Sequence, residues 1–336
     1  MGKPPTIADV AKLAGVHKAT ASRALNPRTA DLVNAKTARR VVLAAKRLRY
    51  QPNSLARSLR TSQSATVGVL IPDLTNPLFP LVVRGIEDTL GAHEYTALLA
   101  NTDDDPERTQ AQFDALLSRK VDGFLIATAW RDDPLLARAA EQGITAVLIN
   151  RTTDVPRYPA VTGDDRSGVA AAVEHLVQLG HRRIAHLAGP MAVSTGFVRA
   201  QAFRHAMAAH TLSDLVVECA AYTEDAGAGA ARSLLDGHPD TTAILAGNDM
   251  IALGVLAVLS ERGLSCPADV SLVGFNDMRF VDKLTPPLTT VHVPHHRLGT
   301  EAARLLLDQL ANPDRAPKTV SLPLELVVRG STGPAR

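Results

Sequence analysis

The sequence predicts an α/β protein in which a small helical head precedes two lobes built on doubly wound parallel sheets. Short apolar runs such as TVGVLIPD and DGFLIATA alternate with helical patterns from Thr66 onward, and a second series begins at RRIAHLAGP. Strands that alternate with helices are typical of parallel sheets with helices on both faces. Charge separates the head from the lobes: residues 1–63 hold 13 Lys or Arg against two Asp, whereas residues 64–336 hold 23 basic and 32 acidic residues.

The charge split also indicates a class of partner. Positive charge gathered in one fifth of the chain predicts a head that binds nucleic acid, because a merely solvated basic face would not be confined there. Uninterrupted apolar runs stay below the length of about 18 residues that a membrane span needs, and the N-terminus lacks the apolar core of a signal peptide. We therefore expect a cytoplasmic protein without membrane contact. Cys219 and Cys266 form no motif, which predicts two buried thiols and neither a disulfide nor a metal site.

The head is expected to contain three helices. Thr6 is suited to cap the first helix, and Gly15 permits the left-handed turn that ends it. A second helix, roughly residues 18–25, and a third, about residues 35–48 behind an Asn34 cap, complete a helix-turn-helix plan, in which the second helix lies in the major groove of DNA. The residues expected to face the head core are Ile7, Val10, Ala11, Ala14, Ala21, Leu25, Val41, Val42, Ala45 and Leu48.

Polar residues follow the predicted strands of both lobes. In doubly wound sheets ligands bind beyond the carboxyl ends of the strands, so these residues are candidates for a cleft, although about half of the Asn and Asp are expected only to cap the following helices. They are Asp73, Asn76, Asn101, Asp103, Asn150, Arg151, Asn248, Asp249, Asn276 and Asp277. Between head and lobes, the stretch NSLARSLRTSQSAT lacks a core pattern and is interpreted as a linker that folds on contact.

Seven segments in order give the chain a family resemblance. The segments are TIADVAKLAGVHKATASRALN, RYQPNSLARSLRT, TVGVLIPDLTNPLF, NTDDDPER, DGFLIA, HLVQLGHRRIAHLAGP, and GNDMIALG with DVSLVGFND and PPLTTV. In this order they resemble bacterial transcription regulators of the lactose-repressor (LacI/GalR) type over about residues 6–330. The resemblance implies a body like a periplasmic sugar-binding protein. It also implies a division into a helix-turn-helix head at 1–51, a hinge helix and linker at 52–64, a first lobe at 65–162 plus about 293–321, and a second lobe at 163–292 plus about 322–332.

The function implied by this resemblance is that of a repressor. It would bind a palindromic site in double-stranded operator DNA as a homodimer or a dimer of dimers, and a small polar effector, a sugar or related metabolite, would bind between the lobes without any cofactor. No leucine heptads follow Glu325, which favours the dimer.

DNA contacts are expected from the second helix and the linker. Lys18 and Ala19 open the second helix, where side chains reach base edges, and the resemblance makes this pair dominant in operator choice. Arg23 suits either a base or a phosphate, and Leu59 is implied to wedge between base steps in the minor groove. The expected contacts are Thr6, His17, Lys18, Ala19, Thr20, Ser22, Arg23, Asn26, Asn53, Arg57, Leu59 and Arg60.

At three positions the sequence departs from the family pattern, and each departure predicts a change in stability or in ligand choice. His17 stands where Ser or Thr usually caps the second helix, which should weaken that end by about 0.5–1 kcal/mol. Arg49 replaces a glycine after the third helix, and a left-handed backbone there would cost about 1 kcal/mol. Asn276 stands where sugar-responsive members commonly have Asp, and an amide both donates and accepts, which weakens the prediction of an ordinary neutral sugar.

Effector contacts are expected from aromatic and polar residues at strand ends. Phe79 and Trp130 would stack on a sugar or a base, with core filling as the alternative for Trp130. Arg199 offers fixed donors to a polyol or carboxylate, with a salt bridge as its alternative, and Asp249 is expected to cap the helix beginning at Met250 and to touch the ligand. The expected contacts are Phe79, Asp103, Trp130, Asn150, Arg199, Asn248, Asp249 and Asn276.

Parts of the sequence would also suit two other classes of protein, a solute-binding protein and an enzyme. The body alone would suit a solute-binding protein for sugar uptake, but the basic head and the missing signal peptide argue against it. An enzyme is disfavoured because the sequence shows no glycine-rich phosphate loop, no metal cluster and no assembled triad. His295 and His296 are interpreted as surface residues, since no partner ligands stand near them in sequence.

Overall fold

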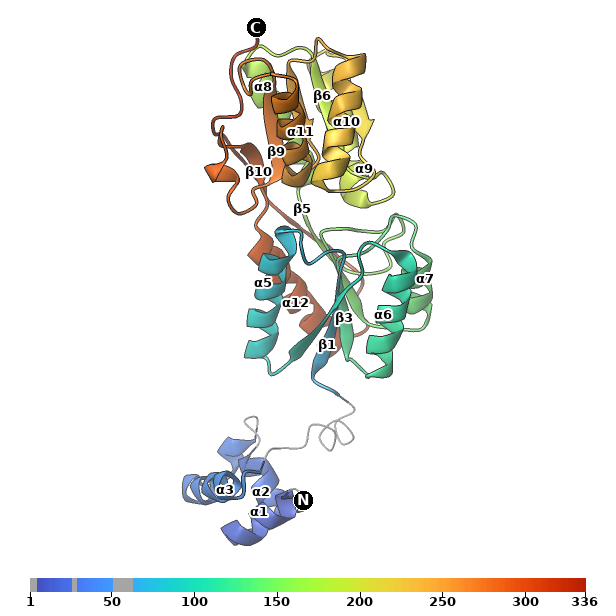
Figure 1. Ribbon diagram of the computed structural model, residues 1–336. Coiled ribbons are helices and arrows are strands. Elements are labelled where there is room, and N and C mark those ends of the chain that lie inside the picture. The colour runs from blue at the N-terminus through green and yellow to red at the C-terminus, as the bar shows by residue number, and fades with distance from the viewer. Residues whose placement is uncertain (1–4, 26–28, 51–62) are drawn as a thin grey trace. The chain divides into compact units, whose positions relative to one another are not determined.

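The computed structural model spans residues 1–336 and describes residues 5–25, 29–50 and 63–336. The chain divides into two compact units, Met1–Ser64 and Ala65–Arg336, drawn in Figure 1. Within the described residues no helix is both long and apolar enough to cross a membrane. The first unit spans the sequence of the predicted head and linker, and the second contains both predicted lobes.

The head is a small helical cluster around three fully buried residues. Val10, Ala21 and Val41 are each 0% exposed, one from each helix. Val42, in contrast, is 38% exposed, so its predicted place in the core is wrong: one residue of helix turns the side chain by about 100°, away from the face that buries Val41. The elements are α1 (Ile7–Ala14), α2 (Lys18–Ala24), the short 3₁₀ helix η1 (Ala30–Leu32) and α3 (Ala35–Leu48).

Local signals in the sequence set the ends of these helices. Thr6 caps α1 together with Asp9, and Gly15 follows at φ 61°, ψ 45°, so that its N–H reaches the carbonyls of Ala11 and Lys12. His17 does cap α2, because its Nδ1 accepts from the N–H of Ala19 at 3.3 Å, and the weakening expected there is partly offset. Arg49 adopts φ 49°, ψ 36°, the strained left-handed backbone that its family position led us to expect.

The first lobe contains a fully parallel six-stranded sheet in the order β11-β5-β4-β3-β1-β2. Helices α5 and α12 cover one face and α6 and α7 the other (Figure 1). Its strands are β1 (Thr66–Ile71), β2 (Thr96–Asn101), β3 (Gly123–Ile126), β4 (Ala146–Ile149), β5 (Ala160–Gly163) and β11 (Thr319–Leu322). Its helices are α5 (Leu78–Ala92), α6 (Pro106–Ser118), α7 (Pro134–Glu141) and α12 (His295–Ala311).

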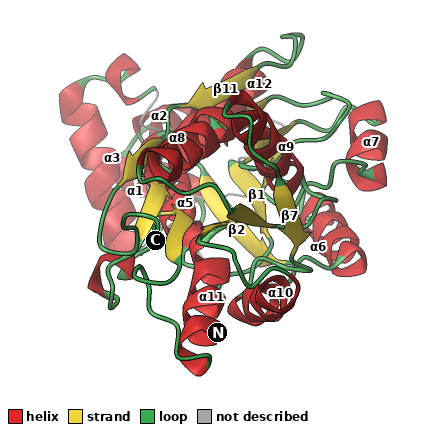
Figure 2. Ribbon diagram, turned by 90° about the horizontal axis from the view of Figure 1, so that it is seen from above, coloured by secondary structure: helices red, strands yellow, loops and turns green. Residues whose placement is uncertain are grey.

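The second lobe repeats this plan with the order β12-β10-β9-β8-β6-β7, in which only the edge strand β12 runs antiparallel among the described strands. Helices α8 and α9 lie on one side and α10 and α11 on the other (Figure 2). Its strands are β6 (Ile184–Ala188), β7 (Leu215–Glu218), β8 (Ala243–Ala246), β9 (Ser271–Asn276), β10 (Thr289–His292) and β12 (Glu325–Val327). Its helices are α8 (Asp165–Gln178), α9 (Ser194–Ala209), α10 (Glu224–Gly237), α11 (Asp249–Glu261) and the 3₁₀ helix η2 (Val281–Lys283).

The chain passes from one sheet to the other after β5, after β10 and between β11 and β12. At the second passage α12 packs so closely on α5 that a Cβ at Gly299 would lie 1.9 Å from the carbonyl oxygen of Val82. The same passage buries His295, which is 4% exposed, and the predicted surface position is wrong for this residue. Its neighbour His296 is exposed and lies 3.1 Å from Asp88. The predicted α/β architecture of a helix-turn-helix head and two parallel-sheet lobes is confirmed.

Both cysteines are free, as expected, but only one of them is fully buried. Cys219 is buried and Cys266 is half-buried. Burial raises the pKa of each thiol to about 12, so both remain protonated and unreactive near neutral pH.

Candidate functional site

The exposed face of α2 presents the candidate DNA contacts of the head. The helix buries Ala21 and Ala24 against α1 and α3, which turns the opposite side outward. Lys18, Ala19 and Arg23 are exposed, and neither basic side chain has a hydrogen-bond partner among the described residues. Free cationic donors on the first turns of a helix suit base edges and phosphate oxygens.

Of the remaining predicted DNA contacts, His17 is exposed and caps α2, and the others fall into three groups. Thr20 and Ser22 are half-buried on α2, so less of each side chain is accessible than at Lys18. The hydroxyl of Thr6 donates to Asp9 at 2.7 Å, and a phosphate contact by Thr6 would compete with this cap. The last group lies outside the described residues and comprises Asn26, Asn53, Arg57, Leu59 and Arg60.

The body holds a cleft of about 310 Å³ between its two lobes. In the first lobe its walls are the loops after β1, β2 and β4 and the start of α5. In the second lobe they are the loops after β7 and β8, the last residue of β9 and the first turns of α9. The lining residues are Pro72, Asp73, Asn76, Leu78, Phe79, Asp103, Asp104, Asn150, Arg151, Thr195, Arg199, Ala221, Tyr222, Thr223, Asn248 and Asn276.

Most predicted effector contacts come together in this cleft. Six of them line it: Phe79, Asp103, Asn150, Arg199, Asn248 and Asn276. Trp130 is not part of the lining formed by the described residues, and neither is Asp249. The sequence reasoning overlooked Tyr222, which follows the edge strand β7 and donates to the Thr195 hydroxyl at 2.9 Å. An aromatic residue just after the apolar run VVECAA was the signal that could have indicated it.

Arg199 is the most constrained side chain of the cleft. It is 3% exposed, donates to the carbonyl of Gly247 at 2.7 Å and to Asp165 at 3.2 Å, and its guanidinium carbon lies 3.7 Å from the ring centre of Phe275. Its Nε is buried and has no partner among the described residues. Burial raises the pKa of Asp165, and the charge of Arg199 opposes that rise. The ion pair expected as the alternative for Arg199 is present, and the residue also lines the cleft, where an effector contact stays a prediction.

Asn276 and Asn248 place amides on the second-lobe side of the cleft. Asn276 has φ 112° and a buried Oδ1 without a partner among the described residues. Asn248 caps α11, since its Oδ1 accepts from the N–H of Ile251 at 2.8 Å, and Asp249 is the first helical residue. The predicted cap at Asp249 is therefore wrong by one position. An unsatisfied acceptor in a buried wall favours a ligand that donates, such as a hydroxyl.

On the first-lobe side the cleft contains an ion pair between a buried arginine and an exposed aspartate. Arg151, whose side chain is 5% exposed, binds Asp104 through both terminal nitrogens at 2.6 and 3.0 Å. Asp104 and its neighbour Asp103 have φ values of 53° and 54°, so two successive left-handed residues turn the loop after β2 into the cleft. Asp103 is itself held by Arg108 and Asn101.

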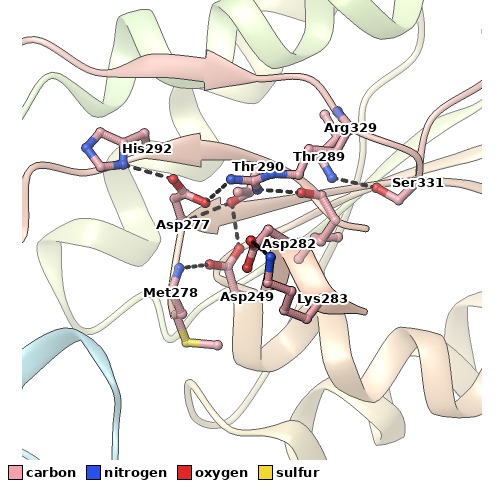
Figure 3. Close-up of polar contacts among 11 residues, drawn as sticks. Asp249, Asp277, Met278, Asp282, Lys283, Thr289, Thr290, His292, Arg329 and Ser331 are labelled. Atoms are coloured by element: carbon pink, nitrogen blue, oxygen red, sulfur yellow. Dashed lines mark hydrogen bonds and ion pairs between the residues drawn. The ribbon is translucent and has the colours of Figure 1, made fainter. Parts of the chain in front are cut away.

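Asp249 belongs to a polar network at the passage between the lobes rather than to the cleft. Its carboxylate accepts from the Thr290 hydroxyl at 2.6 Å and from the N–H of Met278 at 2.8 Å (Figure 3). Burial raises its pKa to about 7. Nearby, Asp277 binds Arg329 at 2.7 Å and His292 at 3.0 Å, so polar side chains tie the end of β9 to β10 and to the segment after β12 (Figure 3).

A metal centre finds no support in the part of the chain that the structure describes. No group of three or more His, Cys, Asp or Glu side chains there is arranged to hold an ion.

Comparison with known proteins identifies the family. Residues 6–53 match the description of bacterial regulatory proteins of the lacI family, and residues 173–332 match a periplasmic binding protein-like domain. The ribose operon repressor of Halalkalibacterium halodurans is 34% identical over 97% of this chain and 97% of its own. The chain belongs to the lacI family of bacterial regulatory proteins. The resemblance inferred from the sequence is confirmed.

Solved structures of lacI-family proteins agree in fold. A transcriptional regulator CelR in complex with cellobiose has a TM-score of 0.75 at 33% identity, with 97% of this chain and 99% of that one covered. A lac repressor dimer bound to operator and the anti-inducer ONPF has a TM-score of 0.86 at 28% identity, with coverage of 98% and 100%. In these two lacI-family structures, therefore, one chain resembles the present chain from head to second lobe.

Proposed function

We propose that this chain is a repressor that binds a palindromic operator as a homodimer and is controlled by a small polar effector in the cleft. The observation that carries this proposal is the presence, in one chain, of a basic head with a free recognition surface on α2 and a polar cleft of about 310 Å³. The relative captured as a dimer on operator with a small molecule supports the same combination.

In the head, Lys18 and Ala19 read base edges. Lysine donates to guanine, and the methyl group of alanine contacts the methyl of thymine. Arg23 binds a phosphate or a base further along α2. Leu59, between Arg57 and Arg60, is proposed to enter the minor groove when two linkers meet on DNA, which would kink the duplex.

In the cleft, we propose an uncharged sugar as the effector. Arg151 and Arg199 are each paired with an aspartate, so the cleft offers little uncompensated positive charge to a phosphate or carboxylate group. The unpartnered Oδ1 of Asn276 and Nε of Arg199 suit hydroxyl groups, which both donate and accept. Phe79, in the wall of the same cleft, supplies an apolar face for a sugar ring.

We also propose that the protein binds its effector without converting it chemically. It would act in the cytoplasm, where bacterial DNA lies. Relatives at 32–34% identity are regulators by name, which supports a binding function rather than catalysis.

Selection of DNA from a random pool tests the proposal. Purified full-length protein should enrich an inverted repeat, and two chains should bind each duplex when stoichiometry is measured by mass photometry. Lys18→Ala should relax the preferred base at one symmetric position, whereas Lys46→Ala, which changes an exposed lysine on the last turn of α3, should leave the preferred sequence unchanged. Enrichment of no sequence at all, or of a site bound by one chain, would contradict the proposal.

A further inference from the structure

The body contains a second cavity, of about 270 Å³, that no part of the proposed function uses. Its walls come from β4, β5, β11 and the segment between β4 and β5 in the first lobe, and from the starts of α8 and α9 in the second. It shares Asn150 with the cleft. Both lobes therefore contribute walls to this second cavity, as they do to the cleft.

Tyr158 gives this cavity an unused hydrogen-bonding group. The residue lines the cavity, is 8% exposed, and its buried hydroxyl has no partner among the described residues. A buried hydroxyl without a partner has lost its hydrogen bonds to water, and a bound ligand group would replace them. Burial raises the pKa of Tyr158 to about 12, so the phenol keeps its proton and remains a donor at neutral pH.

The rest of the polar lining selects against charged ligands. It includes the hydroxyl side chains of Thr152, Thr153, Thr162, Ser194 and Thr319. Two carboxylates lie in the lining, but Asp154 is bound by Arg131 at 2.9 Å through both oxygens and Asp165 is bound by Arg199. The lining formed by the described residues contains no Lys, Arg or His, so an anion would meet two carboxylates and no facing cation.

Two contacts separate this cavity from the effector cleft. Asp165 lines the second cavity and its partner Arg199 lines the cleft, so their buried ion pair stands between the two spaces. The N–H of Thr152 also donates to the Ser194 hydroxyl at 2.8 Å, which joins the two lobes at the wall of the second cavity. The two spaces are therefore treated as two sites.

We propose that the second cavity binds an uncharged polyhydroxyl molecule, a small sugar or polyol, with the Tyr158 hydroxyl hydrogen-bonded to it. Hydroxyl groups of such a ligand match a wall of hydroxyls, because each can donate to one neighbour and accept from another. The site does not depend on the identity of the effector or on DNA binding.

Amide NMR of the full-length, deuterated protein with xylitol as the probe tests this proposal. Xylitol should shift the amide signals of Thr162 and Thr319 in a saturable way, and the signals of Tyr222 and Asn248 report the cleft separately. Tyr158→Phe should raise the xylitol Kd read at Thr162 about tenfold, the equivalent of about 1.4 kcal/mol. The same variant should keep or raise the melting temperature of the unliganded protein, because the deleted hydroxyl is buried and has no protein partner to lose among the described residues.

A matched tyrosine variant and an anionic probe complete the test. Tyr222→Phe removes a hydroxyl from the cleft and should leave the Kd read at Thr162 unchanged. Xylonate, the carboxylate of similar size, should shift neither Thr162 nor Thr319. An unchanged Kd in Tyr158→Phe, equal binding of xylonate, or no saturable shift up to the solubility limit of xylitol would each overturn the proposal.

Discussion

The face of α2 and the wall of the cleft show two ways of building a binding surface. On α2, the side chains of Lys18 and Arg23 are exposed and make no hydrogen bond within the described residues. In the cleft, Arg199, Asn248 and Arg151 each hold part of the protein together while they line the space. The exposed basic side chains of α2 therefore have no visible role in the fold, whereas these cleft side chains help to hold the fold together.

This difference decides how variants should be interpreted. Truncation of a free side chain on α2 removes only its contact with the partner. Truncation of a cleft residue also leaves a buried group without its partner, so a loss of effector binding can reflect damage to the fold. Stability must be measured beside affinity for every cleft variant, and the following changes test the distinction.

The largest effect is expected for Arg199→Ala. The change leaves Asp165 buried without its cation and should lower the free energy of unfolding by about 3–5 kcal/mol. Urea denaturation followed by the fluorescence of Trp130, the only tryptophan of the chain, measures it in the body. The double variant Arg199→Met with Asp165→Asn removes both charges and should recover part of the loss. Equal destabilisation in the single and double variants would show that the ion pair is not the reason.

Asp249→Asn should produce a stability effect that depends on pH. The folded pKa of Asp249 is about 7, against the ordinary value of 3.8, so the folded state binds the extra proton between these values. Its contribution to stability is fully present below about pH 4 and is lost as pH rises through about 7. As pH rises across that window, the free energy of unfolding of the variant should therefore increase relative to that of the parent by up to about 1.4 kcal/mol per pH unit.

Denaturation of parent and variant at matched pH values measures this gain. Burial lowers the pKa of His186 and of His295 to about 4, so these residues make the folded state more stable as pH rises. Parent and variant share both histidines, so this effect cancels in the difference between their free energies of unfolding. Effector affinity at pH 5 should be unchanged, since Asp249 lies outside the cleft lining. A constant stability difference across the window would refute the assignment.

Lys18→Ala tests the exposed face of α2, where truncation should not affect the fold. Operator affinity should fall by about 1–3 kcal/mol, while affinity for random DNA changes little, because a base contact carries the sequence preference. Fluorescence anisotropy on selected and scrambled duplexes measures both, and Lys46→Ala serves as the control for charge. The stability of the head should not change. Equal losses on the two duplexes would assign Lys18 to phosphate.

Arg49→Gly should have the smallest effect and the opposite sign. Glycine takes the left-handed backbone of φ 49° without the Cβ clash, so the head should gain about 1 kcal/mol. Hydrogen exchange of the α3 amides in the full chain would report the gain as slower exchange. Unchanged or faster exchange would show that the strain at Arg49 is already relieved.

Local patterns in the sequence predicted the head better than the cleft. The bounds of α3, the Thr6 cap and the turn at Gly15 follow from residues within one or two helical turns. Six of the predicted effector contacts line the cleft. Four of them, Asp103, Asn150, Asn248 and Asn276, lie at or just beyond the carboxyl ends of strands, as the sequence pattern indicated, whereas Phe79 and Arg199 lie on α5 and α9.

The predictions that failed depended on distant partners. His295 is buried because the chain passes between lobes at that point, and Asp249 is held by Thr290 and Met278, 41 and 29 residues away. The ambiguity between Asn248 and Asp249 as caps cannot be resolved locally, since both residue types cap helices well. Tyr222 follows an edge strand, and only its place in the folded lobe brings it to the cleft.

Coupling between the cleft and the head is the central claim, and calorimetry of effector binding with and without operator tests it most directly. A neutral sugar found by screening would be titrated into the full-length dimer, alone and saturated with the selected operator. Coupling is reciprocal, so operator should change the effector Kd by the same factor by which effector changes the operator Kd, corresponding to about 1–3 kcal/mol. An effector Kd that is identical with and without operator would contradict the account.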